Sequence, residues 1–320
     1  MKALVTGAAG FIGSHLGEAL WRSGARLILV DDLSQGDLSN LTWSHKASGV
    51  EFIQGSISDD KLLRPLLFGC DCVFHQAAFT SVPRSVADPL ASHAVNLNAT
   101  LQLLTAARHA GVKRFFFASS AAVYGDSDAS SRHEGLAPSP LSPYALQKYA
   151  AEKYCQLFHQ LYGLETVCFR YFNVFGPRQS PRSPYSGVIA RFCDAVLRGQ
   201  APTIYGDGSQ TRDFTYVDNV VAANLLAAEA PAGRVAGKVF NVASGQSISL
   251  LELVRELSHL TGQNLVPKFE PPRVGDVRHS AADITAIQQT LGFNVTVPWQ
   301  EGLARTLDYY RGLSDPPATK

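Results

Sequence analysis

The sequence predicts an α/β fold: a doubly wound parallel sheet with a smaller, discontinuous α/β lobe beside it. Two observations favour this fold class. Short, near-continuous apolar runs recur through the first half of the chain, as expected for strands covered on both faces. Segments of helical periodicity lie between these runs, and such alternation is typical of a parallel sheet. With 320 residues, 46% of them hydrophobic, the chain is long enough for two lobes.

The expected elements follow one another in order. Strands are predicted at 2–6, 26–30, 50–54, 72–76, 114–118 and 165–170, and helices near 13–22, 60–68, 93–110 and 144–162. From about residue 173, clusters of proline and glycine predict loops, and Ser249 with Glu252 predicts a capping box that opens a helix at 250–261. We therefore expect one domain over 1–172, to which 213–245 returns, and a second lobe from 173–212 and 246–320.

Charge, cysteine content and hydropathy argue against several classes of protein. A net charge of +1 gives no reason to expect nucleic acid or anionic lipid as the partner. No apolar run approaches the ~20 residues that cross a bilayer, and the first expected strand leaves no room for a signal peptide. The five cysteines match neither a disulfide framework nor a zinc site, and the histidines show no HExxH pattern. We expect no metal, buried thiols at Cys70 and Cys72, and a reduced cytoplasmic protein.

A glycine-rich turn follows the first expected strand and opens a helix. Gly7, Gly10 and Gly13 are spaced G-x-x-G-x-x-G in "VTGAAGFIGSHL". This spacing allows backbone N–H groups to approach a pyrophosphate at the helix N-terminus. The second strand ends at Asp31, 18 residues after Gly13, where a carboxylate can accept hydrogen bonds from an adenosine ribose. Asp31 and Asp32, with no adjacent arginine, repel a 2′-phosphate. The pattern predicts a Rossmann-like domain that binds NAD rather than NADP.

A tyrosine and a lysine stand four residues apart in "LSPYALQKYA". Side chains at i and i+4 share one face of a helix, so Tyr144 and Lys148 can reach one cleft. A phenol with a pKa near ~10 is a poor base at neutral pH, whereas a nearby ammonium and a positively charged nicotinamide favour the phenolate. Ser120 ends the run "RFFFASS", at the edge where doubly wound sheets bind ligands. We interpret Ser120, Tyr144 and Lys148 as one reactive site rather than as surface side chains.

These motifs resemble the extended short-chain dehydrogenase/reductase family, and within it the NAD-dependent nucleotide-sugar 4-epimerases. The resemblance covers nearly the whole chain. It rests on the glycine turn, "SSAAVYG" at 119–125, the Tyr144–Lys148 pair, and further motifs in the family's order. Those motifs are "HQAAFTSVPRS" at 75–85, "VNLNAT" at 95–100, "RYFNVFGPRQ" at 170–179, "GDGSQTRDF" at 206–214 and "RVGDVRHS" at 273–280.

The resemblance implies roles for particular residues. The catalytic positions are Ser120, Tyr144 and Lys148. The implied NAD contacts are Gly7, Gly10, Phe11, Ile12, Gly13, Asp31, Asp32, Ser34, Ser56, Ile57, Gln76, Ala77, Ala78, Thr80, Asn96, Tyr144, Lys148 and Phe172. The implied UDP-sugar contacts are Ser81, Ser120, Asn173, Gly187, Val188, Tyr205, Arg212, Arg273, Asp276 and Ser280. One departure is visible: the family usually carries aspartate where this chain has Ser56, so the adenine contact there is weaker.

The two residues after Ser120 discriminate between reactions within this family. Sugar 4,6-dehydratases carry an Asp–Glu pair there and nucleotide-glucuronate decarboxylases carry a Glu, because an extra proton transfer needs an acid. This chain has Ala121 and Ala122. The resemblance therefore implies an isomerase that inverts C4 of a UDP-hexose through a transient 4-keto sugar. A decarboxylase or dehydratase, and a non-catalytic NAD-binding sensor, stay open as alternatives.

Ser280 indicates which sugars fit. It matches a position that is bulky in epimerases restricted to plain hexoses, so a small residue leaves room for a 2-acetamido group. We expect UDP-N-acetylglucosamine/UDP-N-acetylgalactosamine, UDP-glucose/UDP-galactose, or both. UDP-glucuronate is the alternative, although glucuronate 4-epimerases tend to have threonine where this chain has Asn173. Related proteins pair helices such as 93–110 and 144–162 across a two-fold axis, which implies a homodimer.

Overall fold

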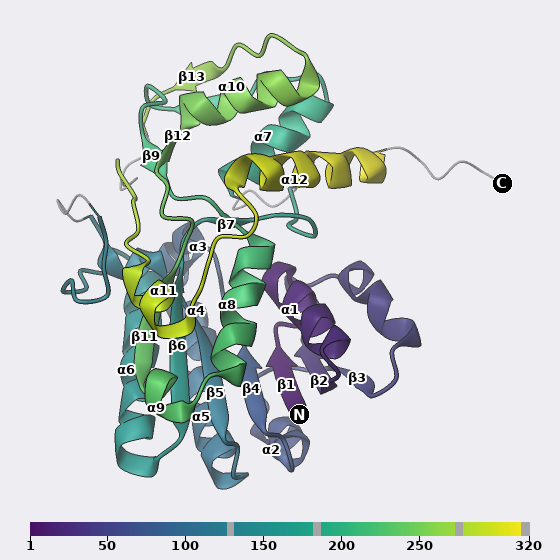
Figure 1. Cartoon of the computed structure of the whole chain (residues 1–320), viewed down its shortest axis with the longest axis vertical. Coiled ribbons are helices and arrows are strands. Elements are labelled where there is room, and N and C mark those ends of the chain that lie inside the picture. Colours follow the sequence, from purple (N-terminus) through teal and green to yellow (C-terminus); the bar gives the residue numbers. More distant parts are fainter. Residues whose placement is uncertain (127–130, 182–186, 273–277, 315–320) are drawn as a thin grey trace.

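The computed structural model describes residues 1–126, 131–181, 187–272 and 278–314 (Figure 1). Its centre is a seven-stranded sheet in the order β11-β6-β5-β4-β1-β2-β3, and every neighbouring pair is parallel. The strands are β1 (Lys2–Thr6), β2 (Arg26–Asp31), β3 (Val50–Gln54), β4 (Cys72–His75), β5 (Arg114–Ser120), β6 (Glu165–Tyr171) and β11 (Lys238–Val242). The predicted doubly wound α/β fold is confirmed.

Helices cover both faces of this sheet. One face packs against α1 (Phe11–Arg22), α8 (Val217–Glu229) and α11 (Thr285–Leu291), and the other against α2 (Asp60–Leu67), α5 (Thr100–His109) and α6 (Pro143–Tyr162). Alternate residues of β5 show why the strand runs are continuously apolar: Phe116 lies in one core cluster, whereas Phe115 and Phe117 lie in the other. Shorter elements complete this part: η1 (Leu38–Lys46), α3 (Val82–Ala87), η3 (Ala121–Tyr124) and α9 (Ala232–Val235).

The helix expected over 93–110 differs from the prediction, because a π-helical turn interrupts it. The run consists of α4 (Pro89–His93), the turn η2 (Ala94–Ala99) and α5. Asn96, inside the turn, accepts a hydrogen bond of 2.8 Å from the Phe79 backbone N–H and donates one of 3.0 Å to the Gln147 side chain. These long-range bonds hold Asn96 in place, and such turns are often found at functional sites.

The remaining elements form a separate core in the upper part of Figure 1. Three two-stranded pairs join β7 (Val174–Phe175) to β10 (Thr215–Tyr216), β9 (Thr211–Arg212) to β12 (Ile248–Ser249), and β8 (Thr203–Tyr205) to β13 (Lys268–Glu270). Around them lie α7 (Val188–Leu197), α10 (Leu250–Thr261) and α12 (Trp299–Ser314). The capping box of Ser249 and Glu252 is present at the start of α10, as predicted.

Two expectations about composition can be compared with the structure. All five cysteines are free and buried, including Cys70 and Cys72. Burial raises the pKa of the Cys72 thiol to about 11, so this thiol is unreactive at neutral pH. Within the described ranges, no helix has both the length and the apolar character that a bilayer crossing requires.

Candidate active site

The glycine-rich turn between β1 and α1 is tight enough to require glycine. Gly7 has a φ of 67°, and a Cβ there would lie 2.6 Å from the backbone nitrogen of Ala77. A Cβ on Gly13 would lie 2.1 Å from the carbonyl oxygen of Gly7. Gly10 precedes α1 as its N-cap, and the first amides of a helix have no intrahelical acceptor. The turn therefore offers N–H donors and a close backbone approach, as a bound pyrophosphate requires.

Asp31 holds this turn from the end of β2. Its carboxylate accepts hydrogen bonds from the backbone N–H groups of Ala9, at 2.9 Å, and Leu33, at 2.8 Å. Burial raises the pKa of Asp31, and these hydrogen bonds oppose the rise. Asp32 is exposed and accepts from the Ser34 N–H at 2.9 Å. A carboxylate has about four acceptor positions, so Asp31 can hold the turn and still accept from a ribose. The cradle fits a dinucleotide.

A buried chain of hydrogen bonds fixes the end of β4 next to this turn. The Ala77 N–H donates to Thr6 Oγ1 at 3.2 Å, and Thr6 Oγ1 lies 2.7 Å from His75 Nδ1. His75 Nε2 lies 2.9 Å from the hydroxyl of Thr100, which itself donates to a helix carbonyl. Thr100 must therefore accept from Nε2–H, which leaves Nδ1 to accept from Thr6. Burial and the charge of a nearby lysine lower the pKa of His75 to about 3, so the ring stays neutral.

Ser120, Tyr144 and Lys148 come together where β5 ends and α6 begins. The Ser120 hydroxyl hydrogen-bonds to the Tyr144 phenol. Lys148 Nζ lies 5.9 Å from the centre of the Tyr144 ring and donates a hydrogen bond of 2.8 Å to the carbonyl oxygen of Ala118. The two helix positions thus share one face, and Lys148, only 2% exposed, is not a surface side chain.

Burial sets the protonation of both groups. It raises the pKa of Tyr144, with the Ser120 hydrogen bond opposing the rise. It lowers the pKa of Lys148 to about 8, with Cys155 and Glu152 opposing the fall. The phenolate expected from the sequence depends on two positive charges, that of Lys148 and that of a nicotinamide. In the chain by itself, Lys148 donates to a carbonyl and burial favours the neutral phenol. A further positive charge beside Tyr144 is needed to make it a base at neutral pH.

The other expected cofactor residues follow the strand ends or line the nearby loops. Gln76, Ala77, Ala78 and Thr80 follow β4, Phe172 follows β6, and Phe11 and Ile12 begin α1. The Ile57 side chain packs in the core and is 6% exposed. Ser56 accepts a local hydrogen bond of 3.2 Å from the Ser58 N–H. Asn96 uses its amide to hold Phe79 and Gln147. Its bonds to the backbone of Phe79 fix the loop that carries Ala78 and Thr80.

The residues expected to contact a sugar nucleotide come from both parts of the chain. Ser81 caps α3, and Asn173 follows β6 with a φ of 29°. Gly187 caps α7, Val188 is the first residue of that helix, and Tyr205 ends β8. These residues belong to separate elements, and only the tertiary fold can bring them near Ser120.

Arg212 and Ser280 adjoin the same backbone position. The carbonyl oxygen of Thr211 accepts 2.8 Å and 3.2 Å hydrogen bonds from Arg212 Nη1 and the Ser280 N–H, respectively. The backbone of Ser280, the residue expected to admit a bulky sugar, therefore lies close to Arg212, the residue expected to bind the diphosphate. Arg273 and Asp276 lie outside the described residues.

Four residues near the site were missed by the sequence-based predictions. Glu152 and Arg170 form a buried ion pair, and Ser119 donates to Glu152. Arg132 is 3% exposed, and its Nη1 donates a hydrogen bond of 2.7 Å to the carbonyl oxygen of His279. This bond anchors the segment next to Ser280. The spacing of Glu152, four residues after Lys148, was the available signal, because it places both side chains on one helix face.

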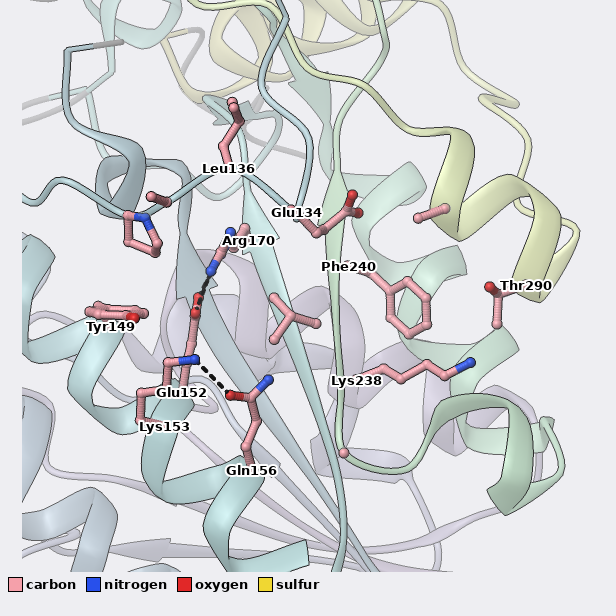
Figure 2. Close-up of a pocket in the computed structure, with 16 residues that line it drawn as sticks. Glu134, Leu136, Tyr149, Glu152, Lys153, Gln156, Arg170, Lys238, Phe240 and Thr290 are labelled. Carbon is pink, nitrogen blue, oxygen red and sulfur yellow. Dashed lines mark hydrogen bonds and ion pairs between the residues drawn. The ribbon is translucent and has the colours of Figure 1, made fainter. Parts of the chain in front are cut away.

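A cavity of about 670 Å³ lies behind this network, between α6, β6, β11 and α11. Figure 2 shows the ion pair of Glu152 and Arg170 on one side of the cavity and Lys238 on the other. Neither Tyr144 nor Lys148 lines this cavity. The candidate active site, formed by the triad, the glycine turn and Asp31, is therefore separate from this cavity.

Comparison with known proteins gives consistent matches along the chain. The sequence model of the NAD dependent epimerase/dehydratase family matches residues 3–243. A UDP-glucose 4-epimerase of Mycolicibacterium smegmatis is 41% identical over 316 residues, which cover 98% of this chain and 100% of the relative. Similar proteins also include sugar-nucleotide decarboxylases and dehydratases at lower identity.

Solved structures agree with these matches. A UDP-N-acetylglucosamine 4-epimerase from Methanobrevibacter ruminantium, in complex with UDP-N-acetylmuramic acid, aligns with a TM-score of 0.93 at 39% identity, covering 98% of both chains. A UDP-glucose 4-epimerase from Thermus thermophilus, in complex with NAD, aligns with a TM-score of 0.88 at 36% identity. That alignment covers 98% of this chain and 99% of the other.

Proposed function

The chain belongs to the NAD-dependent epimerase/dehydratase family, and on that premise we propose that it is an isomerase that inverts C4 of a UDP-hexose. One observation carries the proposal: Ser120, Tyr144 and Lys148 meet at the end of β5, and the next two residues are Ala121 and Ala122. The triad supports proton transfer at a hydroxyl. The alanines supply no further acid for removing water or carbon dioxide.

NAD is the cofactor of this family, and the glycine cradle and Asp31 fit it. When bound, NAD accepts a hydride from the sugar carbon and returns it, and its positive ring favours a phenolate nearby. Gly7, Gly13 and the α1 N-terminus would hold the pyrophosphate, and Asp31 the adenosine ribose. A cofactor used in this way undergoes no net redox change.

The residues of this chain have distinct roles in the proposed reaction. Tyr144 takes the proton from the C4 hydroxyl and gives it back after the 4-keto sugar has turned in the pocket. Ser120 orients that hydroxyl and the phenol through its own hydrogen bonds. Lys148 supplies a positive charge and a donor on the same face of α6. Arg212, with its planar set of donors, holds the diphosphate while the sugar ring rotates.

The preferred sugars in this proposal are UDP-N-acetylglucosamine/UDP-N-acetylgalactosamine and UDP-glucose/UDP-galactose. The small size of Ser280, whose backbone lies close to Arg212, supports acceptance of a 2-acetamido group. UDP-glucuronate is the second candidate, and decarboxylation or dehydration a third. The test is incubation of the enzyme and NAD with each UDP-sugar, followed by NMR and mass spectrometry of the products. A C4 epimer of unchanged mass is expected, whereas loss of water or carbon dioxide would contradict the proposal.

A homodimer is the assembly we propose. Apolar side chains project from one side of α6 at helical spacing, and Leu90 on α4 is also exposed. The exposed apolar residues on this side of α6 are Leu146, Tyr154, Leu157 and Leu161. Exposed apolar side chains on two helices suit an isologous contact with a second copy. Light scattering should give twice the chain mass, and Leu157→Arg with Leu161→Arg should give the monomer. A monomeric unaltered protein would contradict this assembly.

A further inference from the structure

Glu152 and Arg170 form a buried ion pair directly behind the proposed active site. Arg170 donates from Nε to Glu152 Oε1 at 2.9 Å and from Nη2 to Oε2 at 2.7 Å (Figure 2). The side chains are 1% and 4% exposed, respectively. A buried pair of this kind often contributes little net stability, because removing both charges from water is costly. Folding stability alone therefore does not account for an ion pair of Glu152 and Arg170 at this place.

The carboxylate of Glu152 also binds the strand that carries Ser120. The hydroxyl of Ser119 donates to Glu152 Oε1 at 2.5 Å. One helical turn earlier, Lys148 donates to the carbonyl oxygen of Ala118. Two successive positions on one face of α6 thus bind two successive residues of β5. These four residues fix the end of β5, and hence Ser120, against the helix that carries Tyr144 and Lys148.

Resting on the proposed function, we propose that Glu152 is a positioning residue for the epimerisation. Its carboxylate holds the end of β5 in register with α6 and keeps the Lys148 side chain in its charged form. Arg170 orients the carboxylate through two parallel hydrogen bonds, which prevents its rotation away from Ser119.

The charged and titratable groups around Lys148 support an electrostatic role. Its own helix contributes Tyr144, Glu152 and Cys155. From the sheet, β4 contributes His75, a neutral ring whose pKa is lowered by burial and by the charge of Lys148. Cys168 and Arg170, on β6, interact with Glu152. Glu152 is the carboxylate in this set, and it opposes the effect of burial on the lysine. Without the negative charge of Glu152, the buried ammonium of Lys148 would lose its proton more easily.

The decisive variant is Glu152→Gln, which keeps the shape and removes the charge. We expect the midpoint of Lys148 deprotonation, about 8 in the unaltered protein, to fall by roughly one pH unit. The measurement is an NMR titration of protein labelled with ¹⁵N at lysine Nζ, with Lys148 assigned through the loss of its signal in Lys148→Met. The alkaline limb of kcat should move in the same direction.

Two further variants separate charge from position. Ser119→Ala removes the hydrogen bond and keeps the carboxylate, so kcat should fall several-fold while the Lys148 midpoint stays in place. Glu165→Gln is the matched control. Glu165 forms another ion pair with Arg114, with an Nε–Oε2 distance of 2.7 Å. This pair joins β6 to β5 at the end of the strands opposite to Ser120. Glu165→Gln should lower the melting temperature without moving either the Lys148 midpoint or the pH profile.

Equal melting losses in Glu152→Gln and Glu165→Gln, with the Lys148 midpoint unchanged in both, would overturn the inference. If Glu152→Gln does not fold, Glu152→Met combined with Arg170→Met removes both charges and should still shift the midpoint. The titration needs no turnover, so it remains informative if none of the UDP-sugars reacts. A shifted midpoint without epimerisation would retain the electrostatic role of Glu152 and reject the proposed reaction.

Discussion

Lys148 donates a hydrogen bond of 2.8 Å to the carbonyl oxygen of Ala118, two residues before Ser120. This contact joins α6 to the end of β5 inside the protein, where Lys148 is 2% exposed. A lysine buried in this way loses part of its hydration, which explains the low pKa of about 8. The lysine thus has two roles in the proposed site: it fixes the relative position of strand and helix, and it supplies a charge that titrates near neutral pH.

Replacing Tyr144 with phenylalanine removes the proposed proton carrier while keeping the ring. We expect Tyr144→Phe to lower kcat by ~10²–10⁴-fold, with little change in NAD affinity or melting temperature. Tyr149→Phe is the control, because Tyr149 lies on the same helix but faces the cavity behind the site. A Tyr144→Phe enzyme of undiminished rate would contradict the assignment.

Lys148 should make stability depend on pH in the alkaline range. Its folded pKa, about 8, lies below its ordinary value of 10.5, so between these values the unfolded chain binds more protons than the folded one. Stability from this group therefore rises with pH from about 8 to 10.5 and is lost as pH falls through 8. The contribution is on the order of 3 kcal/mol.

The Lys148→Met variant tests this pH dependence. Urea unfolding of both proteins across the range isolates the lysine, because the other titrating groups are common to both. The unaltered protein should gain unfolding free energy as pH rises, whereas Lys148→Met should not gain this contribution. The value for Lys148→Met minus that for the unaltered protein should therefore become steadily more negative or less positive. A difference that is constant from pH 8 to 10 would show that Lys148 keeps an ordinary pKa.

Gly13→Ala should damage both the fold and cofactor binding. The added Cβ would lie 2.1 Å from the carbonyl oxygen of Gly7, which is backbone and cannot rotate away. We expect a loss of ~1–3 kcal/mol in unfolding free energy and weaker NAD binding by calorimetry. Gly312→Ala, in a helix with open space around it, should instead gain up to ~1 kcal/mol. Equal effects of the two substitutions would argue against a tight turn.

Ser280→Tyr should change sugar preference. The Ser280 backbone bonds to Thr211, which precedes Arg212, and a larger side chain there would fill the space proposed for a 2-acetamido group. We expect the ratio of kcat/KM for UDP-N-acetylglucosamine over UDP-glucose to fall at least ~10-fold. Ser280→Ala, which adds no volume, should leave the ratio unchanged. If tyrosine also leaves the ratio intact, Ser280 does not face the sugar.

Local sequence signals predicted much of the fold. The strands at Lys2–Thr6 and Val50–Gln54 have the predicted bounds. A continuous apolar run between two turns is a property of adjacent residues, so the sequence shows it directly. The capping box at Ser249 is local for the same reason. The π-helical turn around Asn96 was not predicted, since its bonds reach Phe79 and Gln147, 17 and 51 residues away.

The sequence by itself determined the alternating α/β pattern, the glycine turn with its carboxylate, and the membership of Tyr144 and Lys148 in one helix face. These depend on spacings of a few residues, which backbone geometry converts directly into position. Only the tertiary structure decided which groups surround Lys148, that Glu152 binds Ser119 and Arg170, and that Ser280 adjoins Arg212. Burial and long-range contacts set the protonation of a side chain, and neither can be read from residue spacing.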